Sequence, residues 1–366
     1  MLICHLTESF GGGVARHITD IIKNGNFANH VLIYSTDRKD TDKKKIDFLK
    51  ETTNIPIFEL PMGGVKALSA IPDLRKLLGD IKPDVLHIHS SFAGMTGRLA
   101  AKDFEFPVIY TPHGFAFLRV TDPFKILYAL IERNLSKYTD KIIAVSNSEK
   151  LIAIKNGIAE EKIIVIENGI NDLMCDYNKT ELRREWGISN KEVVICTLGR
   201  PGKQKGYDLL KKVISKVSKK ITDDTKLRFI IPMNTDFKNI SVILNKSVII
   251  DFVSALDKPS VVLALSDIYI STARWEGGPY GILEAMQHKL PVIASDIPGN
   301  CDYVINQETG LLLPPSCNEF ANAVIMLSLN SELRDKLGES GEIQVKNIFS
   351  LRNMLLKYTN LLNGLI

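Results

Sequence analysis

The chain has 366 residues and a mass of 40.8 kDa, which exceeds one ordinary α/β domain and fits two domains of similar size. Hydrophobic residues make up 45% and charged residues 24%, a balance that excludes a disordered or fibrous protein. The net charge of +4 is spread over both halves of the chain, so we expect no nucleic-acid partner.

Cysteine usage and the apolar runs point to a soluble protein. No two cysteines form a CxxC pair, which argues against a disulfide framework or a zinc knuckle and favours a reducing compartment. Residues 1–13 lack the basic and apolar segments of a signal peptide, and no apolar run approaches the roughly 20 residues that span a bilayer. We therefore expect a soluble or at most peripheral protein.

A short apolar run, a turn and an amphipathic segment alternate along the first half. The apolar runs predict strands at Leu2–Leu6, His30–Tyr34, Ile55–Glu59, Val85–His89, Val108–Thr111, Lys141–Val145 and Ile163–Ile166. Segments with apolar residues at three- and four-residue steps predict helices at Val14–Lys23, Val65–Leu78, Ala93–Lys102, Pro123–Lys137 and Ser148–Asn156. The three lysines at 43–45 are interpreted as part of a solvated loop.

The second half repeats the scheme. It predicts strands at Glu192–Leu198, Leu227–Ile231, Val248–Phe252, Ile268–Ser271, Val292–Ala294 and Leu311–Leu313. It predicts helices at Tyr207–Lys219, Lys258–Leu265, Tyr280–Gln287, Cys317–Leu327, Glu332–Ile343 and Ser350–Leu362. Runs that are apolar at every position, such as residues 193–196, are typical of parallel strands covered on both faces.

This pattern predicts an α/β protein with two Rossmann-like, doubly wound parallel-sheet domains that face a central cleft. The first domain spans residues 1–167 and the second residues 181–349. The polar segment between them, residues 168–180, contains Gly169, lacks periodicity and is interpreted as a linker. Because ligands of such sheets bind at the carboxyl ends of strands, the functional residues are expected in strand-to-helix turns.

Two such turns lie in the first domain. Gly11, Gly12 and Gly13 follow the first strand and open a helix, so the backbone there can approach an anion or a sugar closely. The run is not GxGxxG, and a tight turn without a ligand is the alternative. His113 and Gly114 follow a later strand, where the histidine could donate to a substrate oxygen or be structural.

Two more turns lie in the second domain. Arg200 and Lys205 flank a basic loop that could bind a diphosphate, although the loop is not a P-loop and could be merely solvated. Glu276, in the turn before the helix at 280–287, and Glu284, within that helix, could accept hydrogen bonds from sugar and ribose hydroxyls. An exposed helix carboxylate is the alternative for Glu284.

The segment EGGPYGILEAM, with seven residues between Glu276 and Glu284, resembles the Glu-x7-Glu motif of retaining glycosyltransferase family 4. Further segments fall in the order that the family shows: GGGV near the start, TPHG at 111–114, IIAVSNS at 142–148, VIENGI at 165–170, LGRPGKQKG at 198–206, VIASDIPGN at 292–300 and TGLLLPP at 309–315. The resemblance covers nearly the whole chain. It implies the GT-B fold, an acceptor-binding first domain, a donor-binding second domain, and a last helix, 350–366, that packs back on the first domain.

The resemblance also implies roles for single residues. Arg200 and Lys205 match the basic pair that holds the donor diphosphate, and Glu284 matches the carboxylate on the nucleotide ribose. Glu276 matches the residue at the donor sugar hydroxyls, and His113 the histidine at the transferred sugar. His113, Glu276, Arg200 and Lys205 are thus the implied catalytic residues.

The remaining implied donor contacts are glycines and their neighbours. Gly12 and Gly13 match a glycine loop that packs on donor phosphate and acceptor. The turn before the second-domain helix completes the donor site with Gly277, Gly278, Pro279 and Tyr280.

Departure of a nucleoside diphosphate places charge on its β-phosphate, which Arg200, Lys205 and the helix N-terminus after Gly278 would stabilise. We expect neither a metal ion nor a cofactor. His87 and His89 alternate on a strand, but no carboxylate pair completes a metal site, and they are interpreted as structural or cleft-lining. Retention could proceed by a covalent intermediate or by front-face attack, and no carboxylate of the first domain can be assigned as a nucleophile. The resemblance implies front-face attack.

The leading hypothesis is therefore a metal-independent, retaining glycosyltransferase of bacterial capsule, O-antigen or exopolysaccharide synthesis. It would move a hexose or N-acetylhexosamine from a nucleotide sugar, with UDP favoured over GDP, to a saccharide linked to undecaprenyl diphosphate. Such an enzyme would be cytoplasmic or peripheral on the inner membrane. Phe115, Phe117, Arg119 and Lys125 are candidates for the membrane contact, and both phenylalanines are equally compatible with the core.

Three other functional hypotheses remain open. A GT-B-fold sugar-nucleotide 2-epimerase would need acid and base carboxylates in both domains, and none can be placed. A non-catalytic nucleotide-sugar-binding protein is disfavoured because Arg200, Lys205, Glu276 and Glu284 are all present. A dehydrogenase is disfavoured by the absence of GxGxxG.

Overall fold

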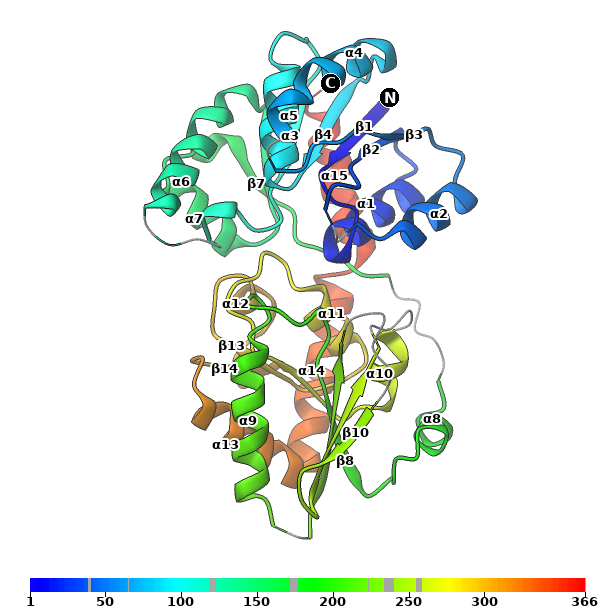
Figure 1. Cartoon of the computed structure of the whole chain (residues 1–366), viewed down its shortest axis with the longest axis vertical. Coiled ribbons are helices and arrows are strands. Elements are labelled where there is room, and N and C mark those ends of the chain that lie inside the picture. Colours follow the sequence, from blue (N-terminus) through cyan, green and yellow to red (C-terminus); the bar gives the residue numbers. More distant parts are fainter. Residues whose placement is uncertain are drawn as a thin grey trace. The chain divides into compact units, whose positions relative to one another are not determined.

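A computed structural model describes residues 1–38, 41–64, 66–118, 121, 123–171, 177–222, 224–233, 240–254 and 259–365. The chain divides into two compact units (Figure 1). Unit 1 comprises Met1–Asn168 and Leu351–Ile366, and unit 2 comprises Gly169–Ser350.

Unit 1 is built on a seven-stranded sheet of parallel strands in the order β3-β2-β1-β4-β5-β6-β7. The strands are β1 (Leu2–Thr7), β2 (Asn29–Tyr34), β3 (Ile57–Glu59), β4 (Val85–His89), β5 (Val108–Thr111), β6 (Lys141–Ala144) and β7 (Ile163–Val165). The helices are α1 (Gly12–Asn24), α2 (Lys43–Thr52), α3 (Lys66–Ser69), α4 (Ile71–Ile81), α5 (Ser91–Ala101), α6 (Phe124–Leu135), α7 (Asn147–Lys155) and α15 (Leu351–Asn363).

Strand alternation gives the unit 1 sheet two apolar faces. On one face Leu6 and Ile88 pack in a core that includes Leu74 of α4. On the other face Ile3 and Val85 pack against the last helix, α15. The C-terminal helix is therefore part of the unit 1 core.

Unit 2 contains a second seven-stranded sheet, in the order β10-β11-β9-β8-β12-β13-β14, in which β10 alone pairs antiparallel among the described strands. Its strands are β8 (Glu192–Cys196), β9 (Lys226–Pro232), β10 (Ile240–Ile243), β11 (Val248–Val253), β12 (Ile268–Ser271), β13 (Val292–Ser295) and β14 (Gly310–Leu313). Its helices are α8 (Lys179–Glu185), α9 (Tyr207–Lys220), α10 (Pro259–Leu265), α11 (Tyr280–Gln287), α12 (Asn300–Tyr303), α13 (Cys317–Leu329) and α14 (Ser331–Asn347).

The predicted architecture of two doubly wound parallel-sheet α/β domains is confirmed. In unit 1 the strand order reverses between β1 and β4, and in unit 2 it reverses between β8 and β12. At such a reversal the loops that leave the two central strands diverge and open a crevice at the strands' carboxyl ends. Each unit therefore has one favoured location for a site.

Two local predictions were wrong. The lysines at 43–45 do not form a loop but begin α2, because Asp42 caps the helix by accepting from the Lys44 backbone N–H, and Ile46 and Leu49 are buried beneath it. The single helix predicted at Val65–Leu78 is divided into α3 and α4, with Ala70 between them and a proline in the first turn of α4.

The structure also distinguishes buried from exposed residues among the candidates for membrane contact. Phe115 and Phe117 are fully buried and stacked on each other, so they belong to the core. Lys125 is exposed on α6, and Arg119 lies outside the described residues. Within the described chain, no helix has the length and apolar character needed to cross a bilayer.

Candidate active site

The turn that carries His113 lies at the carboxyl end of β5 in unit 1. His113 has φ +52° and Gly114 has φ +94°, so two consecutive residues adopt left-handed backbone conformations. For a residue with a side chain, such as His113, this conformation costs about 1–2 kcal/mol and persists only where neighbouring groups hold it.

Glu149, which sequence analysis did not identify, holds this turn. The helix α7 begins after Ser146, whose hydroxyl accepts from the Glu149 backbone N–H at 3.1 Å. The Glu149 carboxylate is buried and accepts from the Gly114 N–H at 2.7 Å and from the Val145 N–H at 2.8 Å. One carboxylate thus ties together the turns after β5 and β6.

A second buried carboxylate, Glu8, lies just after β1. It accepts from the Ala93 N–H, in the first turn of α5, at 2.7 Å and from Arg38 Nη1 at 3.0 Å. Glu8 and Glu149 thus both lie at this edge of unit 1, and both accept backbone hydrogen bonds.

The glycine loop opens α1 as predicted from its composition. The helix starts at Gly12, which has φ +54°, and both Gly12 and Gly13 are exposed. The first N–H groups of a helix have no intrahelical partners, so this exposed end offers donors and a partial positive charge. It is suited to an anion or to sugar hydroxyls.

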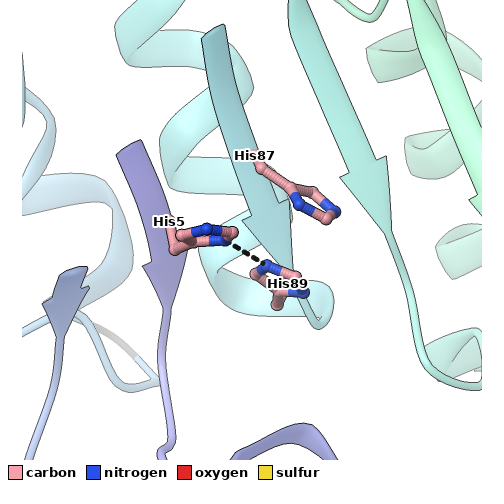
Figure 2. A group of neighbouring side chains, drawn as sticks. All are labelled: His5, His87 and His89. Carbon is pink, nitrogen blue, oxygen red and sulfur yellow. Dashed lines mark hydrogen bonds between the residues drawn. The ribbon is translucent and has the colours of Figure 1, made fainter. Parts of the chain in front are cut away.

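Six of the seven histidines of the chain gather between the unit 1 sheet and the helices α1 and α15. Figure 2 shows three of them: His5 on β1 points toward His89 on β4, with His87 beside them. Sequence analysis singled out His87, His89 and His113. It missed His5, His17 and His30, because the strand order that brings them together cannot be read from spacing.

Burial disfavours the charged form of the buried rings of this cluster. It lowers the pKa of His5, His87 and His89 well below the usual value and lowers that of His17 to about 4. Two triads have nitrogen atoms close enough to share a metal ion, namely His5, His87 and His89, and His17, His89 and His113. Neither triad contains a carboxylate.

In unit 2 the loops that follow β8 and β12 lie against each other on either side of the strand reversal. Lys205 Nζ and Glu276 Oε1 form an ion pair at 2.7 Å, in which Lys205 is about one-third exposed and Glu276 is nearly buried. Arg274 Nη1 and Nη2 bind the two carboxylate oxygens of Asp208 at 2.8 and 2.5 Å. The first pair joins the basic loop to the loop that carries Glu276, and the second joins the Glu276 loop to the first turn of α9.

Two glycines make this close contact possible. Gly206 has φ +64°, and a Cβ atom there would lie 2.0 Å from the Thr272 carbonyl oxygen. Gly299 has φ +91°, and a Cβ atom there would lie 2.6 Å from the carbonyl oxygen of Glu276. The turns after β8, β12 and β13 therefore meet around the backbone of Glu276.

The other predicted unit 2 residues lie at the same edge. Arg200 is exposed just beyond β8, and Glu284 is half-buried within α11. The helix α11 has the predicted bounds and Pro279 as its N-cap, and its first turn follows the buried Gly277 and the half-buried Gly278. Tyr280, its first residue, is buried. The edge combines two cations, two carboxylates and a helix N-terminus, a set suited to a nucleoside diphosphate.

Comparisons with known proteins match both units. Residues 11–172 match the model described as "Glycosyltransferase Family 4", and residues 178–344 match "Glycosyl transferases group 1". A 41.2 kDa uncharacterised protein in the cps region of Klebsiella pneumoniae is 30% identical over 323 residues, covering 86% of each chain. The chain belongs to glycosyltransferase family 4.

Another relative has a named activity. The UDP-Gal:α-D-GlcNAc-diphosphoundecaprenol α-1,3-galactosyltransferase of Escherichia coli is 31% identical over 281 residues, covering 72% of this chain and 71% of that protein. Among solved structures, Anabaena Alr3699/HepE in complex with UDP-glucose has a TM-score of 0.82 at 17% identity, with full coverage of both chains. This family 4 enzyme is thus a glycosyltransferase with the GT-B fold.

Proposed function

We propose that this family 4 glycosyltransferase transfers a hexose or N-acetylhexosamine from a UDP-sugar to a saccharide linked to undecaprenyl diphosphate, with retention of anomeric configuration. The observation that carries the proposal is the 31% identity to the Escherichia coli galactosyltransferase, whose name specifies a UDP-sugar donor and a diphosphoundecaprenol-linked acceptor. The reaction would serve the assembly of a bacterial capsule, O-antigen or exopolysaccharide.

We assign donor binding to unit 2. Arg200 and Lys205 would contact the diphosphate, and Glu284 would accept from the ribose hydroxyls. Glu276, whose Oε1 pairs with Lys205 Nζ at 2.7 Å, would accept from the donor sugar. Gly277, Gly278, Pro279 and Tyr280 would line the donor site at the N-terminus of α11.

We propose that the transfer requires no metal ion. The bond between the anomeric carbon and the β-phosphate oxygen breaks, and the electron pair goes to the phosphate. The charges of Arg200 and Lys205, with the positive end of α11, would stabilise that oxygen as a divalent cation does elsewhere. The acceptor oxygen bonds to the anomeric carbon on the same face, and its proton goes to the departing phosphate.

In unit 1, His113 and the exposed end of α1 at Gly12 and Gly13 would contact the transferred sugar and the acceptor. Support comes from the left-handed backbone of His113 and Gly114, a strained turn of the kind that clusters at functional sites. Glu8 and Glu149 accept backbone hydrogen bonds instead of presenting both oxygens to a substrate, which supports front-face attack without a protein nucleophile.

The lipid-linked acceptor calls for contact with a membrane, and we propose that α6 provides it. Four apolar side chains of α6 are 48–60% exposed, namely Phe124, Ile126, Leu127 and Leu130. The sole acidic residue of α6, Glu132, is buried and paired with Arg98, whereas Lys125 and Arg133 are exposed. An exposed apolar and basic helix fits the interface of an anionic bilayer.

The transfer reaction tests the function directly. The enzyme is incubated with UDP-galactose, UDP-glucose or their N-acetylated forms and a diphospholipid-linked GlcNAc acceptor, with EDTA present, and the anomeric configuration of the product is read by NMR. An α-linked product formed in EDTA supports the proposal. An inverted product, a strict metal requirement, or epimerisation of the UDP-sugar without an acceptor would contradict it.

Vesicle binding tests the role of α6. The double variant I126E/L130E is expected to bind phosphatidylglycerol vesicles at least about tenfold more weakly than wild type, since each apolar side chain that leaves the interface costs about 1–2 kcal/mol. The control L151E changes a leucine on α7 that is at least as exposed as Ile126 and Leu130, and it should bind normally. Equal binding by all three proteins would refute the assignment.

A further inference from the structure

Three buried rings of unit 1 form a continuous line of hydrogen bonds that ends at the half-buried ring of His113. His30 Nε2 lies 3.3 Å from the Gly25 carbonyl oxygen, and His30 Nδ1 lies 3.1 Å from His5 Nε2. His5 Nδ1 lies 3.2 Å from His89 Nε2, and His89 Nδ1 lies 3.1 Å from His113 Nε2. The middle of the line, from His5 to His89, is the dashed contact in Figure 2.

The Gly25 end gives this line a direction. A carbonyl oxygen only accepts, so His30 must carry its proton on Nε2, and in a neutral ring Nδ1 is then the acceptor. His5 must therefore donate from Nε2 to His30, which leaves Nδ1 of His5 to accept from His89. Because His89 donates from Nε2 to His5, its Nδ1 is the acceptor and accepts from Nε2–H of His113.

We propose that His30, His5 and His89 are positioning residues that fix His113 as the Nε2–H tautomer, with Nδ1 as its acceptor nitrogen. This inference rests on the proposed function, in which His113 acts at the transferred sugar. The hydrogen bond of the second ring nitrogen is what sets the tautomer and orientation of a histidine. His113 then meets a substrate as an acceptor through Nδ1, because its Nε2–H is engaged with His89.

The chemistry of the cluster favours this line of hydrogen-bonded neutral rings over a metal site. In each of the two candidate triads the nitrogen atoms lie within 4.8 Å of one another, but neither triad has an anionic ligand, and all of these rings except that of His113 are buried. A dication there would be desolvated without a compensating charge, which is costly. In the hydrogen-bonded line from His30 through His5 and His89 to His113, by contrast, each contact pairs one donor with one acceptor.

Long-range ¹H–¹⁵N spectra of the ¹⁵N-histidine-labelled enzyme test the proposal without substrate, because protonated and unprotonated ring nitrogens resonate far apart. In wild type, His5, His30, His89 and His113 should all show the Nε2–H pattern. In His30→Leu, the anchor at Gly25 is lost, and the His113 signals should move toward the average of the two tautomers. His113→Asn assigns the His113 signals.

His87→Gln is the matched control. His87 belongs to the same buried cluster, and its ring centroid lies 4.0 Å from that of His89, but its Nε2 contacts Thr111 Oγ1 at 2.8 Å. This variant should leave the His113 signals unchanged. If His30→Leu is unstable, His89→Leu removes the last acceptor of the line and should have the same effect on His113.

Three results would overturn the proposal. One is an Nδ1–H pattern for His113 in wild type, and another is an unchanged His113 in both His30→Leu and His89→Leu. The third is stoichiometric zinc in the purified enzyme, with ring signals of His5 and His89 that move when EDTA is added. Each of these outcomes is independent of turnover, so it is distinguishable from failure of the proposed function.

Kinetics extend the test if transfer is observed. His30→Leu should lower kcat by about tenfold or more while KM for the UDP-sugar changes by less than about twofold, since the donor site of unit 2 is untouched. A merely structural role of His30 would lower the amount of folded enzyme without moving the His113 tautomer.

Discussion

Replacement of Glu149 by glutamine should release the turn that carries His113. In the wild type the carboxylate accepts from the Gly114 N–H at 2.7 Å and from the Val145 N–H at 2.8 Å. A glutamine amide has one oxygen, and its NH₂ group would face the second N–H. The variant therefore loses one charge-assisted hydrogen bond and leaves a buried donor without an acceptor.

The structure sets the size of this effect. A hydrogen bond to a charged group contributes about 1.5–3 kcal/mol, so we expect Glu149→Gln to lower the free energy of unfolding by about 3 kcal/mol. The left-handed backbone of His113 costs about 1–2 kcal/mol by itself. Because this cost is close to what Glu149 contributes, the turn should relax and transfer activity should fall by about tenfold or more.

Urea unfolding measures the loss of stability, and hydrogen exchange measures the loosening of the turn that carries His113. Exchange should accelerate at the amides of Gly114 and Val145, while the donor site in unit 2 should still bind nucleotide. Glu161→Gln, which changes an exposed carboxylate, should stay within about 0.5 kcal/mol of wild type. If Glu149→Gln matches that control in stability, exchange and activity, the reasoning is wrong.

Three further predictions concern packing and pH. Gly206→Ala would place a Cβ atom 2.0 Å from a backbone oxygen at φ +64°, and it should lower the free energy of unfolding by more than about 2 kcal/mol and abolish most UDP binding. In Gly202→Ala the new Cβ atom meets open space, so stability and UDP binding in calorimetry should equal those of wild type. Arg98→Met removes the cation that pairs with the buried Glu132 carboxylate, and should lower the free energy of unfolding in urea by about 3–5 kcal/mol, more than the double variant R98M/E132L. Burial lowers the pKa of His17 from 6.5 to about 4, so the unfolded chain binds the proton more tightly than the folded chain. The contribution of His17 to stability is therefore complete above about pH 6.5 and decreases as the pH falls toward 4. In acid titrations followed by circular dichroism, His17→Asn should show a weaker dependence of stability on pH over this range.

Much of the fold could be predicted because local signals and packing agree. The bounds of α11 match the prediction, since glycines and a proline mark its start and its apolar residues face the core. The helix α2 was missed because the lysines at 43–45 hide a short amphipathic pattern, whose two buried residues become apparent only against the sheet. The edge strand β10 was missed because all four of its residues are exposed.

The site in unit 2 was easier to predict than that in unit 1. Glu276 and Lys205 belong to loops whose composition is itself informative, and they meet as an ion pair. Glu149 had a local signal, since Ser146 and Glu149 match the Ser-x-x-Glu capping pattern, but the pattern does not say that its carboxylate reaches the turn after β5. The histidine line needed the strand order, which places β1 between β2 and β4.

The assignment of the donor site to unit 2 depends on nucleotide binding there. Thermal shifts are measured with UDP, GDP, ADP and NAD on wild type, Arg200→Ala and Glu284→Ala, with Lys203→Ala as a control on an exposed cation of the same loop. At 100 times its dissociation constant, a ligand of the native state stabilises by about 2.7 kcal/mol. We predict that UDP stabilises wild type and Lys203→Ala but neither Arg200→Ala nor Glu284→Ala. Stabilisation by NAD instead of UDP, or by UDP equally in all four proteins, would contradict the account.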